Sequence, residues 1–80
     1  MFFVYILYSS KFERFYVGMT INLDKRLKNH NSGSVKSTKA YLPWIIIHAE
    51  SYNTRKEARQ REKYLKSAAG RRWRKHNLAR

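Results

Sequence analysis

The segment FFVYILYSSKFERFYVGM, residues 2–19, carries the clearest structural signal in the chain. Residues 2–8 form an almost uninterrupted apolar run rich in aromatic and β-branched side chains, which is typical of a strand buried on both faces. Residues 14–19 predict a second strand, and the turn-forming residues between them predict a hairpin with a loop of about five residues. Gly18, near the end of this strand, indicates either a bulge or a close backbone approach.

The residues that follow predict a helix and a third strand. Thr20 or Asn22 can cap a helix that extends to about Asn31, where the sequence NSGS ends it. Residues 34–43 are polar and basic and predict an irregular or partly helical connection. Residues 44–50, WIIIHAE, predict the third strand.

Two helices are expected in the C-terminal third. Thr54 begins a capping box, the pattern S/T-x-x-E, and opens a helix that we expect to reach about Ala69. Gly70 is expected to end that helix, and residues 71–78 to form a short terminal one. We therefore expect an α+β fold: a small three-stranded, mainly antiparallel sheet flanked by helices, in the order β-β-α-β-α-α, as a single domain over residues 1–80.

The composition excludes several classes of protein. The chain has 80 residues, enough for one domain, and no cysteine, which excludes disulfides, thiolate zinc sites and thiol nucleophiles. No apolar run approaches the ~18 residues that a membrane span requires. The N-terminus lacks the basic segment of a secretory signal, so we expect a cytoplasmic protein.

The charge of the chain points to an anionic partner. Lys and Arg number 18 and Asp and Glu number 5, which gives a formal net charge of +13. Solubility alone needs a net charge of roughly 2–8, and the basic C-terminal region has few large apolar residues with which to bind a membrane surface. We therefore expect a nucleic acid, DNA in the first place, and no membrane. The positions expected to bind it are Lys39, Arg59, Lys63, Lys66, Arg71 and Arg72.

One acidic residue falls where the core is expected. Glu62 lies on the same helical stripe as Ala58 and Leu65, and its neighbours in sequence are basic. One interpretation is a partly buried glutamate paired with a neighbouring cation. The other is a carboxylate that binds a hard divalent cation or acts as an acid or base, because Mg²⁺ is commonly held by one or two carboxylates together with substrate phosphates.

Polar groups also fall on the inner faces of the first helix and the hairpin. His30 continues the stripe of Leu23, and Arg26 precedes it by one turn, so the two can address one phosphate, the guanidinium binding two oxygens. Tyr5 and Tyr16 occupy strand positions that an apolar residue could fill, and a buried phenol needs a hydrogen-bond partner. Each of these residues also has a purely structural interpretation.

Together these residues resemble the GIY-YIG nuclease family. Within that family they resemble the short stand-alone proteins related to the nuclease domain of the bacterial excision-repair endonuclease. The two half-motifs stand here as Val4-Tyr5-Ile6 and Tyr16-Val17-Gly18. Arg26 and His30 correspond to the arginine helix of the family, and Glu62 to its metal-binding glutamate.

The resemblance implies a reaction and a role for each residue. A water attacks a DNA phosphodiester, and Glu62 binds a single Mg²⁺ or Mn²⁺ ion. Tyr16 is the general base or positions the water, and Tyr5 orients the water or the phosphate. Arg26 stabilises charge on the phosphoryl group, and His30 supports the phosphate or shares in proton transfer. Tyr has an ordinary pKa of about 10, so its action as a base near neutral pH requires nearby cations.

Three functions remain open from the sequence. The first is a divalent-metal-dependent DNA endonuclease that hydrolyses or nicks phosphodiester bonds, in DNA repair or recombination. The second is a non-catalytic basic nucleic-acid-binding module. The third is a structural or partner-binding domain of a larger repair complex. We expect no separate targeting domain in a chain of this length, so a protein partner or homodimer is expected to supply targeting if the protein has any.

Overall fold

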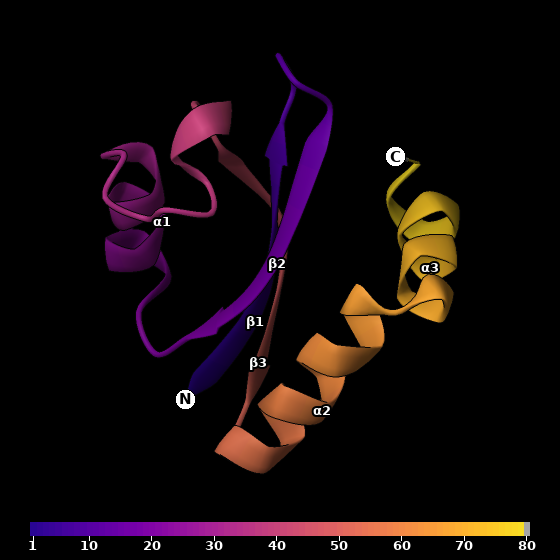
Figure 1. The fold of residues 1–80 in the computed structure, drawn as a ribbon. Helices are drawn as coiled ribbons and strands as arrows, with labels where there is room; N and C mark the ends of the chain where they lie inside the picture. The colour runs from indigo at the N-terminus through magenta and orange to yellow at the C-terminus, as the bar shows by residue number, and fades with distance from the viewer. Residues whose placement is uncertain (80) are drawn as a thin grey trace.

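The computed structural model describes residues 1–79 and confirms the expected order of elements and the α+β fold class (Figure 1). A short 3₁₀ helix, η1, lies inside the connection that was expected to be partly helical. The elements are β1 (Phe2–Ser9), β2 (Arg14–Thr20), α1 (Leu23–Asn31), η1 (Lys39–Tyr41), β3 (Ile45–Tyr52), α2 (Arg55–Lys66) and α3 (Ala68–Leu78).

The sheet has the order β2-β1-β3, with β1 antiparallel to both neighbours. The central position of β1 explains why its sequence is apolar on both faces. The predicted bulge does not lie at Gly18, where the pairing with β1 is regular; the register instead shifts between Ile6 and Leu7, in the pairing of β1 with β3. β2 and β3 run parallel to each other, so the connection containing α1 crosses over β1.

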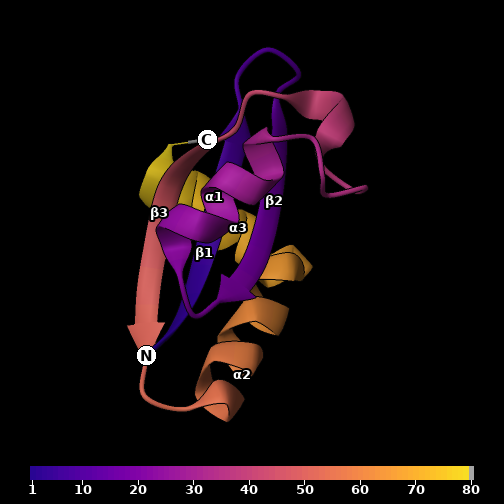
Figure 2. The same ribbon diagram turned by 90° about the vertical axis from the view of Figure 1, so that its left-hand side faces the viewer.

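The two faces of the sheet carry separate groups of helices. α1 and η1 lie on one side, and α2 and α3 on the other (Figures 1 and 2). Because successive strand residues point to opposite faces, Val4 and Ile6 of β1 pack in the core with Ala58 and Leu65 of α2. On the other face the buried core consists of Tyr5, Leu7 and Trp44.

Side chains connect α1 to the start of β3. The amide of Asn31, the last residue of α1, donates to the Trp44 carbonyl oxygen at 2.9 Å and accepts from the Trp44 backbone N–H at 2.7 Å. The Trp44 indole N–H donates to the carbonyl oxygen of Thr38 at 2.9 Å. These bonds fix the connection that carries Thr38 against the α1 face of the sheet.

The C-terminal helices differ from the expectation. The helix that was predicted to reach Ala69 ends at Lys66, and Gly70 lies inside α3 instead of ending α2. The reason is Ser67, whose hydroxyl donates to the Tyr64 carbonyl oxygen and accepts from the Gly70 N–H, so that it ends one helix and caps the next. The helices of residues 1–79 are each too short or too polar to cross a membrane.

Candidate active site

The hydroxyl of Tyr5 is the centre of the candidate site. Tyr5 lies in the central strand with 1% of its surface exposed, and its Oη is 3.0 Å from Nε2 of His30. Arg26 of α1 donates to the same oxygen from Nε at 3.4 Å. Gly18 is paired with Tyr5 across the hairpin, and a Cβ placed on Gly18 would lie 2.5 Å from Tyr5 Oη. The group that approaches Gly18 closely is therefore the side chain of Tyr5 and not the backbone that was predicted, and only a glycine leaves room for the phenol.

A chain of hydrogen bonds extends inward from this hydroxyl. His30 has no exposed surface, and its Nδ1 is 2.8 Å from Oγ1 of Thr38. Thr38 has a single hydroxyl proton and donates it to the Val35 carbonyl oxygen at 3.4 Å. Thr38 therefore accepts the hydrogen bond from His30 Nδ1–H, which leaves Nε2 to accept from the Tyr5 hydroxyl.

The surroundings keep Tyr5 and His30, the inner groups of this hydrogen-bond network, uncharged. Burial, assisted by the positive charge of Arg26, lowers the pKa of His30 to about 4, so that the imidazole is neutral at pH 7. Burial also raises the pKa of Tyr5, and this effect outweighs the hydrogen bond from Arg26, which acts in the opposite direction. Tyr5 is thus a neutral phenol that donates to His30.

Tyr16 lies beside the hydrogen-bonded residues Tyr5 and His30 but nearer to the surface. It is half-buried, and its ring centroid is 4.7 Å from that of His30 and 6.3 Å from that of Tyr5. The hydrogen bond to Tyr5 raises the pKa of Arg26; burial opposes this, and contact with Tyr16 adds to the rise. The guanidinium therefore interacts with both phenols, of which Tyr16 is the more accessible.

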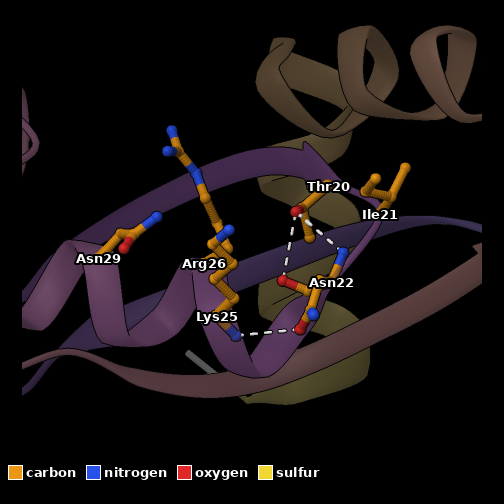
Figure 3. Close-up of a pocket in the computed structure, with 6 residues that line it drawn as sticks. All are labelled: Thr20, Ile21, Asn22, Lys25, Arg26 and Asn29. Atoms are coloured by element: carbon orange, nitrogen blue, oxygen red, sulfur yellow. Dashed lines mark hydrogen bonds between the residues drawn. The ribbon is translucent and has the colours of Figure 1, made fainter.

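A cavity of about 210 Å³ opens beside Arg26. In Figure 3 the side chains of Arg26 and Asn29 extend to the same side of α1. Asn22 forms part of the rim and caps α1 by accepting from the Lys25 backbone N–H at 3.0 Å, which confirms one of the two predicted caps. The cavity is lined by Thr20, Ile21, Asn22, Lys25, Arg26 and Asn29, two of them cationic, and suits an anionic group.

Glu62 approaches from the opposite face of the sheet. Its side chain is 10% exposed, with Oε2 3.2 Å from Lys66 Nζ and Oε1 3.6 Å from Arg59 Nη1. The pairing with neighbouring cations that the sequence suggested is therefore present. The negative charge of Glu62 also adds to the raised pKa of Tyr5, so the carboxylate acts electrostatically on the centre of the site.

The donor set around Glu62 fits one kind of metal site. Within residues 1–79, no cluster of three or more His, Cys, Asp or Glu side chains is present to surround an ion. Glu62 would then be the single protein ligand, an arrangement suited to Mg²⁺, which keeps several waters and often binds through few carboxylates plus substrate phosphates. Oε2 of Glu62 is paired with the ammonium of Lys66 at 3.2 Å, so a metal ion there would take the place of that ammonium.

The predicted nucleic-acid contacts fall into two groups. Lys39 lies in η1, on the α1 side of the sheet. The others are exposed on α2 and α3, on the opposite side: Arg59, Lys63, Lys66, Arg71 and Arg72.

Thr38 belongs to the site but was not predicted from the sequence. It lies in the polar connection before η1, where no periodic pattern distinguishes inward from outward residues. Its 1% exposure and its contact with His30 are products of the tertiary fold.

Known proteins resemble this chain over most of its length. The GIY-YIG catalytic domain matches residues 1–77. A UPF0213 protein of Bacillus licheniformis is 48% identical over 52 residues, which are 64% of this chain and 54% of the relative. A UPF0213 protein of Clostridium perfringens is 42% identical over 65 residues, 80% of this chain and 69% of the relative. The match thus spans only about half the length of the first relative.

A solved structure extends the likeness to the fold. The solution NMR structure of a UPF0213 protein from Bacillus halodurans superposes with a TM-score of 0.53 at 30% sequence identity. The superposition covers 91% of this chain and 81% of the other.

Proposed function

The chain belongs to the GIY-YIG catalytic-domain family, as a relative of the UPF0213 proteins, and we propose that it is a divalent-metal-dependent DNA endonuclease. It hydrolyses or nicks phosphodiester bonds, in DNA repair or recombination. The observation that carries this proposal is the hydrogen bond from Arg26 to Tyr5, with Tyr16 beside it and the neutral His30 behind it.

Arg26 is the group that binds the reacting phosphate. Its Nε is engaged by Tyr5, which fixes the guanidinium beside an open cavity. A guanidinium held in this way is preorganised to stabilise the negative charge that develops on a phosphoryl group in the transition state.

The two tyrosines have different functions in this mechanism. Tyr16 is the accessible phenol next to Arg26, so it positions the attacking water or accepts its proton. Tyr5 is buried and uncharged, and it orients Arg26. His30 has no surface that a phosphate can reach, and it acts by fixing the direction of the Tyr5 hydroxyl.

Glu62 is the proposed ligand of Mg²⁺ or Mn²⁺. A divalent ion bound there supplies Lewis-acid stabilisation of the phosphoryl oxygens. Binding requires Lys66 and Arg59 to move away from the carboxylate, and both side chains are 54% exposed. Their exposure leaves them free to turn toward solvent or toward the phosphates of bound DNA.

A non-catalytic nucleic-acid-binding module is the second candidate. The observation that favours it is the pairing of Glu62 with Lys66 and Arg59, which neutralises the carboxylate without any metal. A protein of this kind binds DNA equally well with and without divalent ions and leaves it intact.

Incubation with supercoiled plasmid tests the proposal. We expect nicking in Mg²⁺ or Mn²⁺ and none in EDTA. Glu62→Gln removes the metal-binding charge and is expected to abolish nicking, whereas Glu57→Gln, an exposed position on the same helix, retains it. Nicking that resists EDTA, or that survives Glu62→Gln, would contradict the metal-dependent mechanism. Stable DNA binding without nicking under all these conditions would establish the second candidate.

Arg26→Ala separates catalysis from binding. The substitution removes one of 18 basic residues, so non-specific affinity for DNA should fall only slightly. Removal of a transition-state contact typically lowers turnover about 100-fold or more. Plasmid nicking rates and equilibrium binding in EDTA measure the two effects. If both fall to the same extent, Arg26 only docks the DNA.

A further inference from the structure

A second cavity, of about 200 Å³, lies on the face of the sheet opposite to the cavity of Arg26. It is formed by β2, the end of α2 and the first turns of α3, and we refer to it as the β2–α3 pocket. Its lining is Phe15, Val17, Leu65, Lys66, Arg71 and Arg74.

The protein holds the two guanidinium groups of the pocket in place. Arg71 donates from Nη1 to the Lys66 carbonyl oxygen at 3.3 Å, at the C-terminal end of α2. The Arg74 guanidinium lies over the ring of Phe15, 3.7 Å from its centroid. Guanidinium groups fixed by stacking and by backbone contacts lose less conformational entropy when they bind an oxyanion.

The charge of the pocket is of one sign. Three of its six lining residues are cationic and none is acidic. Burial and, to a smaller extent, the nearby charge of Arg71 lower the pKa of Arg74. An oxyanion that enters the pocket meets Arg71 and Arg74 together, while Val17 and Leu65 provide an apolar floor of the kind that a sugar ring can contact.

Lys66 connects the pocket to the candidate active site. Its side chain lines the pocket and its ammonium contacts Glu62 at 3.2 Å. A ligand in the pocket is therefore adjacent to the proposed metal ligand.

We propose that the β2–α3 pocket binds a backbone phosphate of the nucleic acid, and that this phosphate flanks the reacting phosphodiester. The identity of this ligand rests on the proposed function. Arg71 and Arg74 contact the phosphate oxygens, and the attached sugar lies on the apolar floor.

Fluorescence anisotropy of a labelled DNA oligonucleotide tests this site in EDTA, where no metal-dependent cleavage occurs. The full-length Arg71→Gln protein is compared with Lys75→Gln, which removes a charge from the same helix at an exposed position outside the pocket. We expect Arg71→Gln to weaken binding about fivefold and to reduce the slope of log K against log salt by about 0.7–0.9. Lys75→Gln should change the affinity less than about twofold.

Two outcomes would contradict phosphate binding in the β2–α3 pocket while leaving the endonuclease proposal intact. Equal losses in Arg71→Gln and Lys75→Gln, in a protein that nicks plasmid, would indicate a diffuse charge effect. Competition by a glutamate-rich peptide as effective as that by unlabelled oligonucleotide would assign the pocket to an acidic protein partner. Conversely, a selective loss in Arg71→Gln in a protein that never nicks DNA would support the pocket and refute the endonuclease. Urea unfolding of both variants establishes that they fold.

Discussion

At the scale of single residues, the orientation of Tyr5 depends on a hydroxyl that no substrate can touch. Thr38 accepts from His30 Nδ1 at 2.8 Å and thereby decides which imidazole nitrogen faces Tyr5. A different tautomer would make His30 a donor to Tyr5 and turn the phenol proton elsewhere. Thr38 is therefore a positioning residue that acts through two others.

Thr38→Val preserves shape and removes this hydroxyl. The buried Nδ1–H of His30 then lacks an acceptor, which should reduce the free energy of unfolding by about 1–3 kcal/mol. We expect the plasmid nicking rate to fall while affinity for DNA in EDTA stays unchanged, because Thr38 is 1% exposed. Urea unfolding, nicking and anisotropy measure the three effects. Thr38→Ser, which restores the hydroxyl, should recover the nicking rate; failure to recover would refute the hydrogen-bond argument.

The sequence predicts those residues of the candidate site that lie on regular helices and strands. His30 and Glu62 stand out because each continues an apolar helical stripe, and both are buried as expected. Tyr5 and Tyr16 stand out because each places a phenol at a strand position that an apolar residue could fill. Thr38 does not, because an irregular segment has no period from which its inward side can be inferred.

At the scale of elements, the junction between α2 and α3 shows where local propensity misleads. Glycine usually marks a helix end because it adopts a left-handed conformation easily. Gly70 instead lies inside α3, where a Cβ would be under 3 Å from the Tyr64 carbonyl oxygen and the Leu65 backbone. The glycine is needed for the close approach of two helices, a tertiary requirement that sequence spacing does not reveal.

Gly70→Ala should therefore destabilise the protein, although this substitution normally stabilises a helix by about 1 kcal/mol. We expect a loss of about 1–3 kcal/mol in the free energy of unfolding, because backbone atoms must move to admit the methyl group. Gly33→Ala is the comparison: a Cβ there would meet Leu42 Cδ1 at 3.9 Å, an ordinary contact distance, but φ is +80°, so its smaller cost, about 1 kcal/mol, comes from backbone strain. A stabilised Gly70→Ala protein in urea unfolding would contradict the packing argument.

At the scale of the whole molecule, two titrating groups on opposite sides of the sheet link stability to pH. His30 lies on the α1 side, and its pKa is lowered to about 4. Glu50 of β3 contacts Arg61 of α2 at 2.9 Å. Burial alone would raise the pKa of Glu50, but hydrogen bonds from Arg61, Tyr52 and His48 lower it to about 2.

Both shifts make the folded state less stable in acid than at neutral pH. His30 is protonated first in the unfolded chain, so the free energy of unfolding falls as pH decreases from about 6.5 to about 4. The Glu50 contribution falls as pH decreases from about 4.5 to about 2. We expect the protonation of each group to reduce the free energy of unfolding by roughly 2–3 kcal/mol. Urea unfolding at pH 7, 5 and 3 measures this loss.

Substitutions identify which group is responsible for each stage of this loss of stability. His30→Gln should flatten the stability curve between pH 6.5 and 4, and Glu50→Gln should flatten the part below pH 4.5. An unaltered curve in either variant would show that another group is responsible for that stage.

The attachment of α1 has a consequence for the protein at elevated temperature. Tyr5 belongs to the middle strand, which has a neighbour on each side, whereas Arg26 and His30 come from a nine-residue helix whose apolar contacts with the sheet include the half-buried Leu23 and Leu27. Short elements with few apolar contacts open before the core melts. Warming will therefore withdraw the guanidinium from its phenol while the sheet stays intact, and cooling will return it.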